Sequence, residues 1–509
     1  MKRIIYILFI VGILPIYSCE DYLDVNVDPN NPVDAPTELV LPSVQLSITG
    51  AVSNYYHLTG SIWSQFYTQS NVASQYISID NYDIQTTFLD REYQELYAGA
   101  LNDIRFIKEK AVAEEDWTIN LMATVLEAYA FQILADLYDR IVFKEAAQGG
   151  SGNFAPSFDP GAEVYDSLII RIDNALSKDF GALTATDPGV NDLIFGGNIN
   201  SWIAFANTLK LKILMRESLI TGSTTPAAIG TLVDGGASFL TTDAAISSFV
   251  DETGRSNPLF ESDRRELNTS NNLKGSFTLM NYLESNADPR LDTLFEEPLN
   301  EGVMRGQIQG TNSLSTTELD PDDISRAEIL ATDPAYFMTA SEAYFLRAEA
   351  AARGFTSEDA ESLYNAGVTA AFARFGEDME AAAASFIGVG GAYEYPAGTQ
   401  SENINAIMMQ KWVSQARANG MEAWFDILRT GIPGWSPVAA DDAAYDPTSL
   451  NGDGKPQVLT WPEDAVTFEA QGQYPHRLFY PDRETDRNPE APSQTANTIF
   501  TAVWWDVID

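Results

Sequence analysis

The chain has 509 residues, of which 45% are hydrophobic and 11% aromatic, so it has ample material for a packed core and is not a disordered protein. Its 30 Lys and Arg residues face 72 Asp and Glu residues, and the resulting net charge of −42 argues against nucleic acid as a partner. The chain contains two histidines, His57 and His476, and one cysteine, Cys19. This composition argues against histidine-based zinc sites, Ser-His-Asp catalysis and a disulfide framework.

The N-terminus has the features of a secretory signal. Lys2 and Arg3 precede an apolar run at residues 4–16, which is too short to cross a membrane. The run leads into Ile16-Tyr17-Ser18-Cys19, the pattern of a bacterial lipobox, in which the cysteine becomes the acylated first residue. An ordinary signal peptide or a free thiol is the alternative. We therefore predict a lipoprotein signal peptide at residues 1–18 and lipidation at Cys19.

A proline-containing segment follows the cysteine. Pro29, Pro32 and Pro36 fix the backbone and remove hydrogen-bond donors, so residues 19–38 are predicted to form an extended tether. We expect residues 39–509 to form a single body.

Helical periodicity recurs in pairs along this body. One pair begins at Thr339, where Thr339 and Glu342 have the spacing of a capping box, and its first helix stops at Gly354. Its tight turn and small residues resemble a tetratricopeptide unit, and such units must stack because each buries only one face. A plain helical bundle is the alternative. The predicted pairs lie near residues 93–138 (93–112 with 120–138), 162–218 (162–177 with 200–218), 339–376 and 403–429 (403–418 with 420–429).

Three long segments between the pairs are rich in Gly, Ser, Thr, Asn and Asp but keep aromatic residues. We interpret residues 219–335, 377–402 and 432–500 as structured, loop-rich insertions. Recognition residues commonly lie on such loops when a rigid scaffold holds them.

The segment 63–84 is the richest source of binding candidates, because it combines aromatic rings with neutral amides, the residue types that bind sugars. Trp63, Phe66 and Tyr67 have helical spacing, which favours core packing over ligand contact. Tyr76 and Tyr82 lie in a polar, helix-poor stretch and are better candidates. The full set of predicted ligand-binding residues is Tyr76, Tyr82, Trp63, Tyr67, Gln75, Asn81, Phe260 and Trp435.

Motifs for catalysis are missing from the sequence. It contains no Gly-x-Ser-x-Gly elbow, no phosphate loop and no His-Glu-x-x-His, and with so many carboxylates no acidic pair stands out as catalytic. Asn451-Gly452-Asp453-Gly454 faintly resembles a calcium loop, but Thr460 stands where the bidentate glutamate belongs, so we interpret it as a turn. We predict no cofactor and no dedicated metal ligands, and leave open a structural calcium among the carboxylates.

Several blocks of sequence, in order along the chain, resemble SusD/RagB-type lipoproteins, specifically the SusD-like group of Bacteroidetes. In the block Leu134–Ile141, Asp139 stands where the family has Gly, and Val142 follows where it has Pro. Glu20 and Asp21, directly after the cysteine, are similar to a surface-export signal of these lipoproteins. The other blocks are Cys19–Asp24 with Asn26, Asp28, Pro29 and Asn30, then Trp202–Arg216, Asp288–Arg290, Glu342–Gly354, Lys411-Trp412, Glu422–Asp426, Arg429–Gly431 with Pro433, Arg477–Pro481 with Glu484 and Asn488, and Trp504–Asp506.

The resemblance implies an all-α fold with about four tetratricopeptide-like helix pairs beside a loop-rich ligand-binding region. It implies a non-catalytic lipoprotein, lipid-anchored in the outer membrane and facing the cell exterior. Such a protein would pass oligosaccharide to a TonB-dependent, SusC-like transporter. Two alternatives remain, a peptide-binding member of the family and a secreted, carboxylate-dependent glycosidase. Most matched residues are expected to be scaffold, and Trp424, Arg429 and Trp505 are interpreted as core or buried-pair residues.

Overall fold

The computed structural model describes residues 35–507 apart from 183, 270, 301 and 464–472. The predicted signal peptide, Cys19 and most of the predicted tether therefore lie outside the described residues. The tether prediction extends too far by two residues, because helix α2 (Thr37–Val52) already begins at Thr37.

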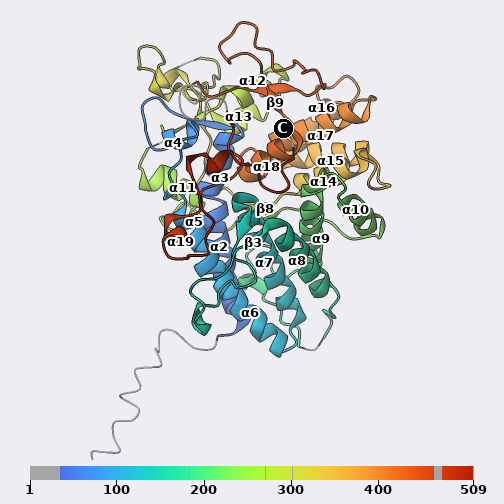
Figure 1. Ribbon diagram of the computed structural model, residues 1–509. Coiled ribbons are helices and arrows are strands. Elements are labelled where there is room, and N and C mark those ends of the chain that lie inside the picture. The colour runs from blue at the N-terminus through green and yellow to red at the C-terminus, as the bar shows by residue number, and fades with distance from the viewer. Residues whose placement is uncertain (1–34, 183, 270, 301, 464–472, 508–509) are drawn as a thin grey trace, which may run out of the picture.

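The described part of the chain is mainly helical, as predicted (Figure 1). In the lower part of Figure 1, α6, α7, α8 and α9 pack side by side. The central helix of this group is α7, whose first turn is capped by the Asp116 side chain accepting from the backbone N–H of Ile119. The bounds are α6 Asn102–Ala113, α7 Trp117–Tyr138, α8 Gly161–Leu176 and α9 Ile199–Arg216.

Among the described residues, α7 is also the one helix long and apolar enough to cross a membrane, but 94% of its apolar window is buried inside the protein. That burial is typical of a core helix.

A second group of helices stacks on the first through α9 and α14. The prediction of a helix pair at 339–376 matches α14 and α15, and α17 with α18 matches the pair near 403–429. The segment 377–402, predicted to be loop-rich, contains α16. The bounds are α10 Thr225–Asp234, α14 Ala340–Ala352, α15 Ala360–Ala373, α16 Glu377–Ile387, α17 Gln400–Gln415 and α18 Gly420–Thr430.

The remaining part holds short elements joined by loops, at the upper left and top of Figure 1. Its four-stranded sheet has the order β1-β5-β7-β6, with antiparallel pairing throughout. The strands of this sheet are β1 Tyr67–Gln69, β5 Leu273–Gly275, β6 Phe295–Glu296 and β7 Arg326–Ala327. There are also three two-stranded pairs among the described residues: β4 Ala244–Ile246 with β8 Ala335–Met338, β9 Gly434–Trp435 with β10 Gln457–Leu459, and, beside α7 and α8, β2 Arg140–Ile141 with β3 Asp159–Pro160.

Short helices and single turns complete the fold, most of them in this part and two, η3 and η4, between the long helices of the first group. They are α3 Tyr55–Trp63, α4 Ile77–Asp80, α5 Asp90–Gln94, η2 Glu95–Leu101, η3 Gly149–Ser151, η4 Gly189–Asn191, α11 Pro258–Phe260, η5 Glu261–Glu266, α12 Phe277–Ser285, α13 Leu291–Leu294, η6 Thr311–Ser313, η7 Pro321–Asp323, α19 Asp482–Thr485 and η9 Ala496–Phe500. We call residues 102–216 and 340–430 the helical region, and residues 55–89, 240–338 and 432–507 the loop-rich region.

Charged side chains fill the centre of the helical region. Lys212 contacts Glu342 at 2.8 Å and Glu422 at 3.0 Å, and Arg216 contacts Glu422 at 2.5 Å. The predicted capping box at Thr339 is therefore only half formed, because the Glu342 carboxylate faces Lys212 while Thr339 still accepts from the Glu342 N–H. The buried charge network comprises Asp136, Lys212, Arg216, Glu342, Glu349, Lys411, Glu422, Asp426 and Arg429.

Pairing outweighs the cost of burial for Glu349, Glu422 and Asp426, whose pKa values are lowered, whereas burial still raises the pKa of Asp136 and Glu342. Burial alone would raise the pKa of Glu422, but Lys212 and Arg216 hold it at about 2. Arg429, predicted to be a buried-pair residue, is 1% exposed and donates to both carboxylate oxygens of Glu349, at 2.8 and 2.6 Å. The network thus joins α7, α9, α14, α17 and α18.

In the loop-rich region, neutral amides supplement separate buried ion pairs such as Asp288 with Arg290 and Asp263 with Arg264. Gln65 donates to the Thr460 carbonyl and accepts from Thr460 N–H at 3.1 Å and the Thr278 hydroxyl at 2.6 Å. Gln307 donates to the carbonyl of Gln69 at 2.8 Å. The four glutamines that we call the buried glutamines are 0–1% exposed and each bonds to a segment distant in sequence: Gln65, Gln69, Gln307 and Gln309.

The two regions meet where α3 crosses α18. A Cβ added at Gly60 would lie 2.4 Å from the backbone carbon of Gly420, and one at Gly420 would lie 2.3 Å from the Ser61 hydroxyl. Real Cβ atoms do not approach so closely, so only glycine permits this crossing.

The last described segment enters the helical region. Trp505 is fully buried and its indole N–H donates to Asp136 at 2.8 Å. The neighbouring Trp504 ring occupies the space above Gly161, where a Cβ would lie 2.1 Å from it. Residue 505 is therefore part of the same core as α7, as its interpretation as a core residue predicts.

Candidate functional site

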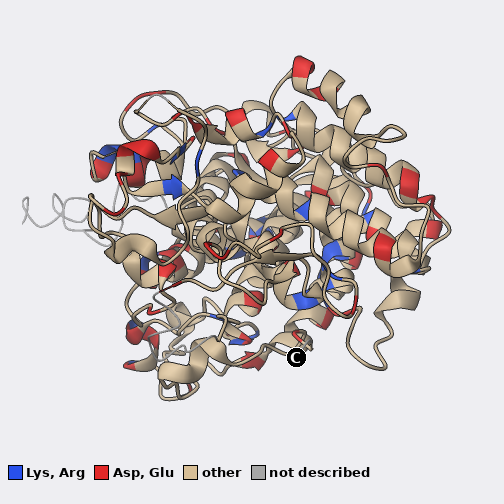
Figure 2. Ribbon diagram, turned by 90° about the horizontal axis from the view of Figure 1, so that it is seen from above, with Lys and Arg blue, Asp and Glu red and all other residues tan. Residues whose placement is uncertain are grey.

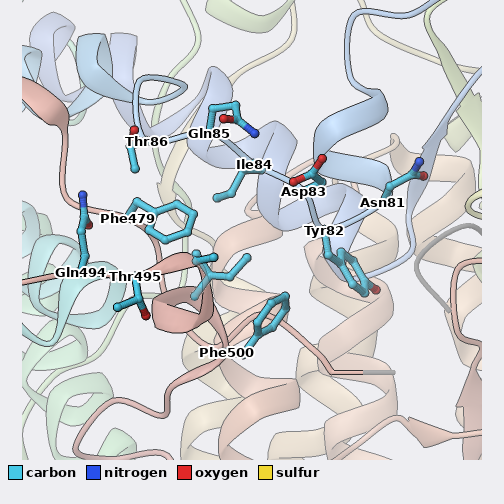
Figure 3. Close-up of a pocket in the computed structure, with 12 residues that line it drawn as sticks. Asn81, Tyr82, Asp83, Ile84, Gln85, Thr86, Phe479, Gln494, Thr495 and Phe500 are labelled. Atoms are coloured by element: carbon cyan, nitrogen blue, oxygen red, sulfur yellow. The ribbon is translucent and has the colours of Figure 1, made fainter. Parts of the chain in front are cut away.

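A cleft of about 550 Å³ lies between the loop that follows α4 and the C-terminal segment around η9 (Figure 3). Phe479 and Phe500 supply half-buried rings, and most of the remaining side chains are neutral and polar. The lining residues are Asn81, Tyr82, Asp83, Ile84, Gln85, Thr86, Phe479, Gln494, Thr495, Ala496, Ile499 and Phe500.

A buried carboxylate fixes the first wall of the cleft. Asp80 is 0% exposed and accepts from the Thr68 hydroxyl at 2.9 Å and from the backbone N–H groups of Gln69 at 3.2 Å and Gly310 at 2.9 Å. Asn312 bridges Asp80 and the cleft residue Asn81, at 3.2 and 2.9 Å. Because the anchor is made through side chains, the loop 81–86 needs no regular secondary structure to hold its shape.

Asp80 has only neutral partners. Burial raises its pKa to about 6, although the hydrogen bonds from Gly310, Thr68, Gln69 and Asn312 act in the opposite direction. The carboxylate is still mostly ionised at neutral pH.

The second wall is held by the Gln494 side chain, which bonds to both backbone groups of one residue, as a neighbouring β-strand would. The Gln494 amide accepts from the backbone N–H of Tyr480 at 2.9 Å and donates to its carbonyl at 3.0 Å. Thr495 begins η9 with a reciprocal cap, since its backbone N–H donates to Thr498 at 2.8 Å. These bonds place Phe479 and Phe500 opposite the loop 81–86 (Figure 3).

Tyr76 and Tyr82 do not form the exposed platforms that the sequence suggests. The ring of Tyr76 is 0% exposed, and its hydroxyl donates to Asp263 at 2.8 Å. Tyr82 is 2% exposed, with its backbone in the left-handed region at φ 60°, and it forms part of the cleft floor. The expectation of exposure is wrong because long-range contacts with Asp263 and Tyr474 bury rings that the local polar sequence leaves open.

The other candidates of the same segment divide between core and surface. Trp63 and Tyr67 are buried, as their helical spacing favours, and the Trp63 indole donates to the carbonyl of Ile79 at 3.0 Å. Asn81 is 4% exposed, and Gln75 is exposed but does not line the cleft.

Phe260 and Trp435 lie elsewhere. Phe260 is half-buried beneath the guanidinium of Arg265, 5.2 Å from the ring centroid. Trp435 is half-buried and stacks on Trp461 with centroids 4.0 Å apart and planes at 10°. Neither residue lines the cleft.

A chain of aromatic contacts nevertheless joins Trp435 to the cleft floor. Trp435 packs edge-on against Tyr474 at 4.9 Å, Tyr474 against Tyr82 at 5.8 Å, and Tyr82 against Trp63 at 6.3 Å. Trp63 in turn packs on Trp424 of α18 at 4.7 Å. The cleft floor is therefore fixed directly to the helical region.

Five residues of the cleft could not be selected from local sequence: Phe479, Phe500, Gln85, Thr86 and Gln494. Phe479 falls within a block that resembles the family's scaffold, and the others lie in low-periodicity segments. Only the fold brings the loop 81–86 against residues almost 400 positions later.

Metal chemistry finds no support in the described part of the chain, where no group of three or more His, Cys, Asp or Glu side chains is placed to hold an ion. The segment Asn451–Gly454 forms the predicted turn, with Asn451 Oδ1 accepting from the backbone N–H groups of Asp453 and Lys455, each at 2.9 Å.

Residues 29–450 match a protein-family profile, SusD-like, whose description is "starch-binding associating with outer membrane". The match covers more than half of the chain. This protein belongs to the SusD-like family. The family is thus associated with the outer membrane by its description, and no curated protein sequence matches the chain.

Solved structures of SusD homologues share the fold. A chitin-binding SusD homologue from Flavobacterium johnsoniae superposes with a TM-score of 0.72 at 20% identity, covering 92% of this chain and 98% of that one. A homologue from Bacteroides uniformis gives 0.70 at 21% identity, with 93% and 100% covered. One from Bacteroides fragilis gives 0.70 at 17% identity, with 93% and 99% covered. The helical fold implied by the resemblance to SusD/RagB proteins is confirmed.

Proposed function

We propose that this SusD-like protein is a non-catalytic surface receptor that captures an oligosaccharide in the cleft and delivers it to a TonB-dependent, SusC-like transporter. Cys19, in its lipobox, would be the lipidated residue that anchors the body to the outer membrane with the cleft facing the exterior. The family description and the chitin-binding structural relative support a glycan as the ligand.

The observation that carries the proposal is the chemistry of the cleft walls. Phe479 and Phe500 offer apolar faces for the CH-rich side of a pyranose ring, while Gln85, Thr86 and Thr495 offer neutral hydrogen-bonding groups at the rim. Gln494 is less available, since its amide already bonds to Tyr480 at both ends.

The alternative function, a glycosidase, fits this cleft less well. Glycoside hydrolysis uses two carboxyls roughly 5–10 Å apart across the scissile bond. Among the described residues that line the cleft, Asp83 is the single carboxylate. Incubating the protein with its glycan separates the two readings, because an enzyme yields shorter chains and a receptor returns its ligand intact.

Ligand capture is tested by a glycan-array screen followed by Phe479→Ala and Phe500→Ala. We expect each substitution to weaken binding about tenfold, since one aromatic contact is worth about 0.5–1.5 kcal/mol beyond its buried area. Phe260→Ala makes the same change at a half-buried ring outside the cleft and should leave affinity unchanged. Loss of binding in Phe260→Ala alone would move the site away from the cleft, and a co-purifying peptide in place of a sugar would favour the peptide-binding alternative.

Delivery is tested separately from capture. The full chain, isolated from outer membranes in mild detergent, should bring a TonB-dependent transporter with it, and its first residue should carry lipid at Cys19. Isolation without any such transporter, or a native protein with an unmodified Cys19, would contradict this part of the proposal.

A further inference from the structure

The walls of the cleft carry no positive charge. Of the twelve described residues that line it, none is Lys, Arg or His, and Asp83 is the one formally charged group at neutral pH. Burial raises the pKa of the Tyr82 phenol well above its usual range, so that side chain stays neutral.

The sequence around both walls explains this lack of cations. No Lys or Arg occurs between residues 4 and 90, which include the whole first wall, and none occurs from residue 488 to 509, which include η9. The two arginines that flank Phe479 are engaged elsewhere. Arg477 donates to the carbonyl of Tyr138, and Arg483 donates to Gln94 at 3.0 Å.

Negative charge, by contrast, is present on the wall and behind it. Asp83 is exposed at the cleft, and its carboxylate has no hydrogen-bond or ion-pair partner in the described structure. Asp80 lies behind the same wall, linked to Asn81 through Asn312 and without any cationic partner. Over the whole molecule, acidic residues recur around the outline (Figure 2), in keeping with the net charge of −42.

We infer that the cleft selects neutral oligosaccharides and rejects glycans that bear carboxylate or sulfate groups. A ligand anion in the cleft would lose part of its hydration without gaining a cation in return, and it would face Asp83 at short range. The field of the whole molecule would also slow its approach. Neutral sugars meet none of these penalties. This inference rests on the proposed function and specifies the class of ligand for the same cleft.

The test uses a matched pair of ligands. A neutral oligosaccharide that binds the full-length protein is compared with the same chain after oxidation of its C6 hydroxymethyl groups to carboxylates, by calorimetry at low salt. We expect the oxidised chain to bind at least tenfold more weakly. The difference should shrink in about 1 M salt, where charges are screened beyond about 3 Å.

Reversing the charge at the wall provides the second arm. Asp83→Lys should raise the affinity for the oxidised chain relative to the affinity for the neutral chain about tenfold or more. Asp378→Lys, on an exposed position of α16, changes the net charge equally and should have little effect on either ligand. The fold is not at risk at residue 83, because its one hydrogen bond to the rest of the chain is made by its backbone, to Ser78 at 2.8 Å.

The outcomes separate the inference from the proposed function. Equal affinity for the neutral and oxidised chains, or no gain in Asp83→Lys, would overturn the charge selectivity while glycan capture stands. Binding of anionic chains alone would overturn it more directly. If no glycan of either kind binds, the proposed function itself fails and the inference falls with it.

Discussion

The helical and loop-rich regions are both cross-linked by buried polar side chains, but the helical region relies on one connected network of charges, whereas the loop-rich region adds neutral amides to separate ion pairs such as Asp288 with Arg290. In the helical region, Lys212 and Arg216 neutralise carboxylates that would otherwise be costly to bury. In the loop-rich region, Gln65 and Asp80 bond to backbone groups and hydroxyls without any cation. The difference follows from what each region must satisfy. Helices bond their own backbone and leave side chains free to pair, whereas loops leave backbone groups that only a side chain can reach.

The largest expected effect comes from breaking the buried charge network. Arg216→Met keeps the bulk but leaves Asp136 and Glu422 short of their cation, so we expect the free energy of unfolding to fall by about 3–5 kcal/mol. Urea denaturation, followed by circular dichroism, measures this free energy of unfolding. Arg105→Met removes a pair with Glu109 in which both side chains are about half exposed or more, and should cost under about 1 kcal/mol. Similar losses in the two variants would show that the network contributes no more than a surface pair.

The seam between the regions should be the next most sensitive place. Gly60→Ala forces a methyl group against the backbone of α18, and we expect a loss of about 3 kcal/mol through overpacking. Gly50→Ala on α2 meets no atom within 4 Å and should be neutral or slightly stabilising, because alanine favours helix. Thermal unfolding compares the stability of the two variants. A Gly60→Ala protein as stable as the native protein would mean that α3 and α18 can shift apart.

Removing one buried glutamine should cost somewhat less. Gln65→Leu preserves volume but leaves the Thr460 carbonyl and N–H and the Thr278 hydroxyl unpaired, for a loss of about 2 kcal/mol. Hydrogen exchange at β10 should rise before exchange in α7 does. An equal rise in hydrogen exchange at β10 and α7 would show that the loop-rich region does not open on its own.

The smallest effect is one of pH, and here Asp80 of the loop-rich region should respond in the opposite direction to Glu349 and Glu422 of the helical region. Asp80 has its pKa raised from 3.8 to about 6, so its contribution to stability is present at low pH and is lost as the pH rises through 6. Glu349 and Glu422 have pKa values lowered to about 2, so theirs is present above pH 4.5 and is lost as the pH falls toward 2.

Acidification from pH 7 to pH 5 should therefore raise the free energy of opening of residues 76–82, measured by hydrogen exchange and corrected for the intrinsic rate, by about 1–2 kcal/mol, and leave that of α18, which carries Glu422, unchanged. Asp80→Asn should remove this pH dependence. If protection of residues 76–82 depended on pH equally in Asp80→Asn and in the native protein, another group would be responsible for the effect.

The long helices could be predicted from the sequence, whereas several other elements could not. Helical periodicity predicts α7, α8, α9, α14 and α15, because each buries one face or nearly all of itself. It does not predict α2, which has Pro42 inside it, or α16, which lies in a segment rich in Gly and Ala.

The binding candidates show the limit more sharply. Tyr76 and Tyr82 lie in a polar stretch, and local composition cannot reveal that Asp263 and Tyr474, far along the chain, cover them. Phe479 and Phe500 become candidates only when the fold brings them opposite residue 85. Asp139 is an intermediate case. It stands where the family has Gly, and its backbone keeps a left-handed conformation, φ 66°, that glycine reaches without strain.

The indole of Trp505 has a consequence for biosynthesis. Asp136 lies near the start of the body, but one of its hydrogen-bond donors is made only when residue 505 has been synthesised. A nascent chain can form α7 early and still lack this contact until residue 505 has been synthesised. We expect a chain truncated after residue 500 to be digested by a protease much faster than the 509-residue chain, because Asp136 then loses a hydrogen-bond donor that lies 369 residues further along.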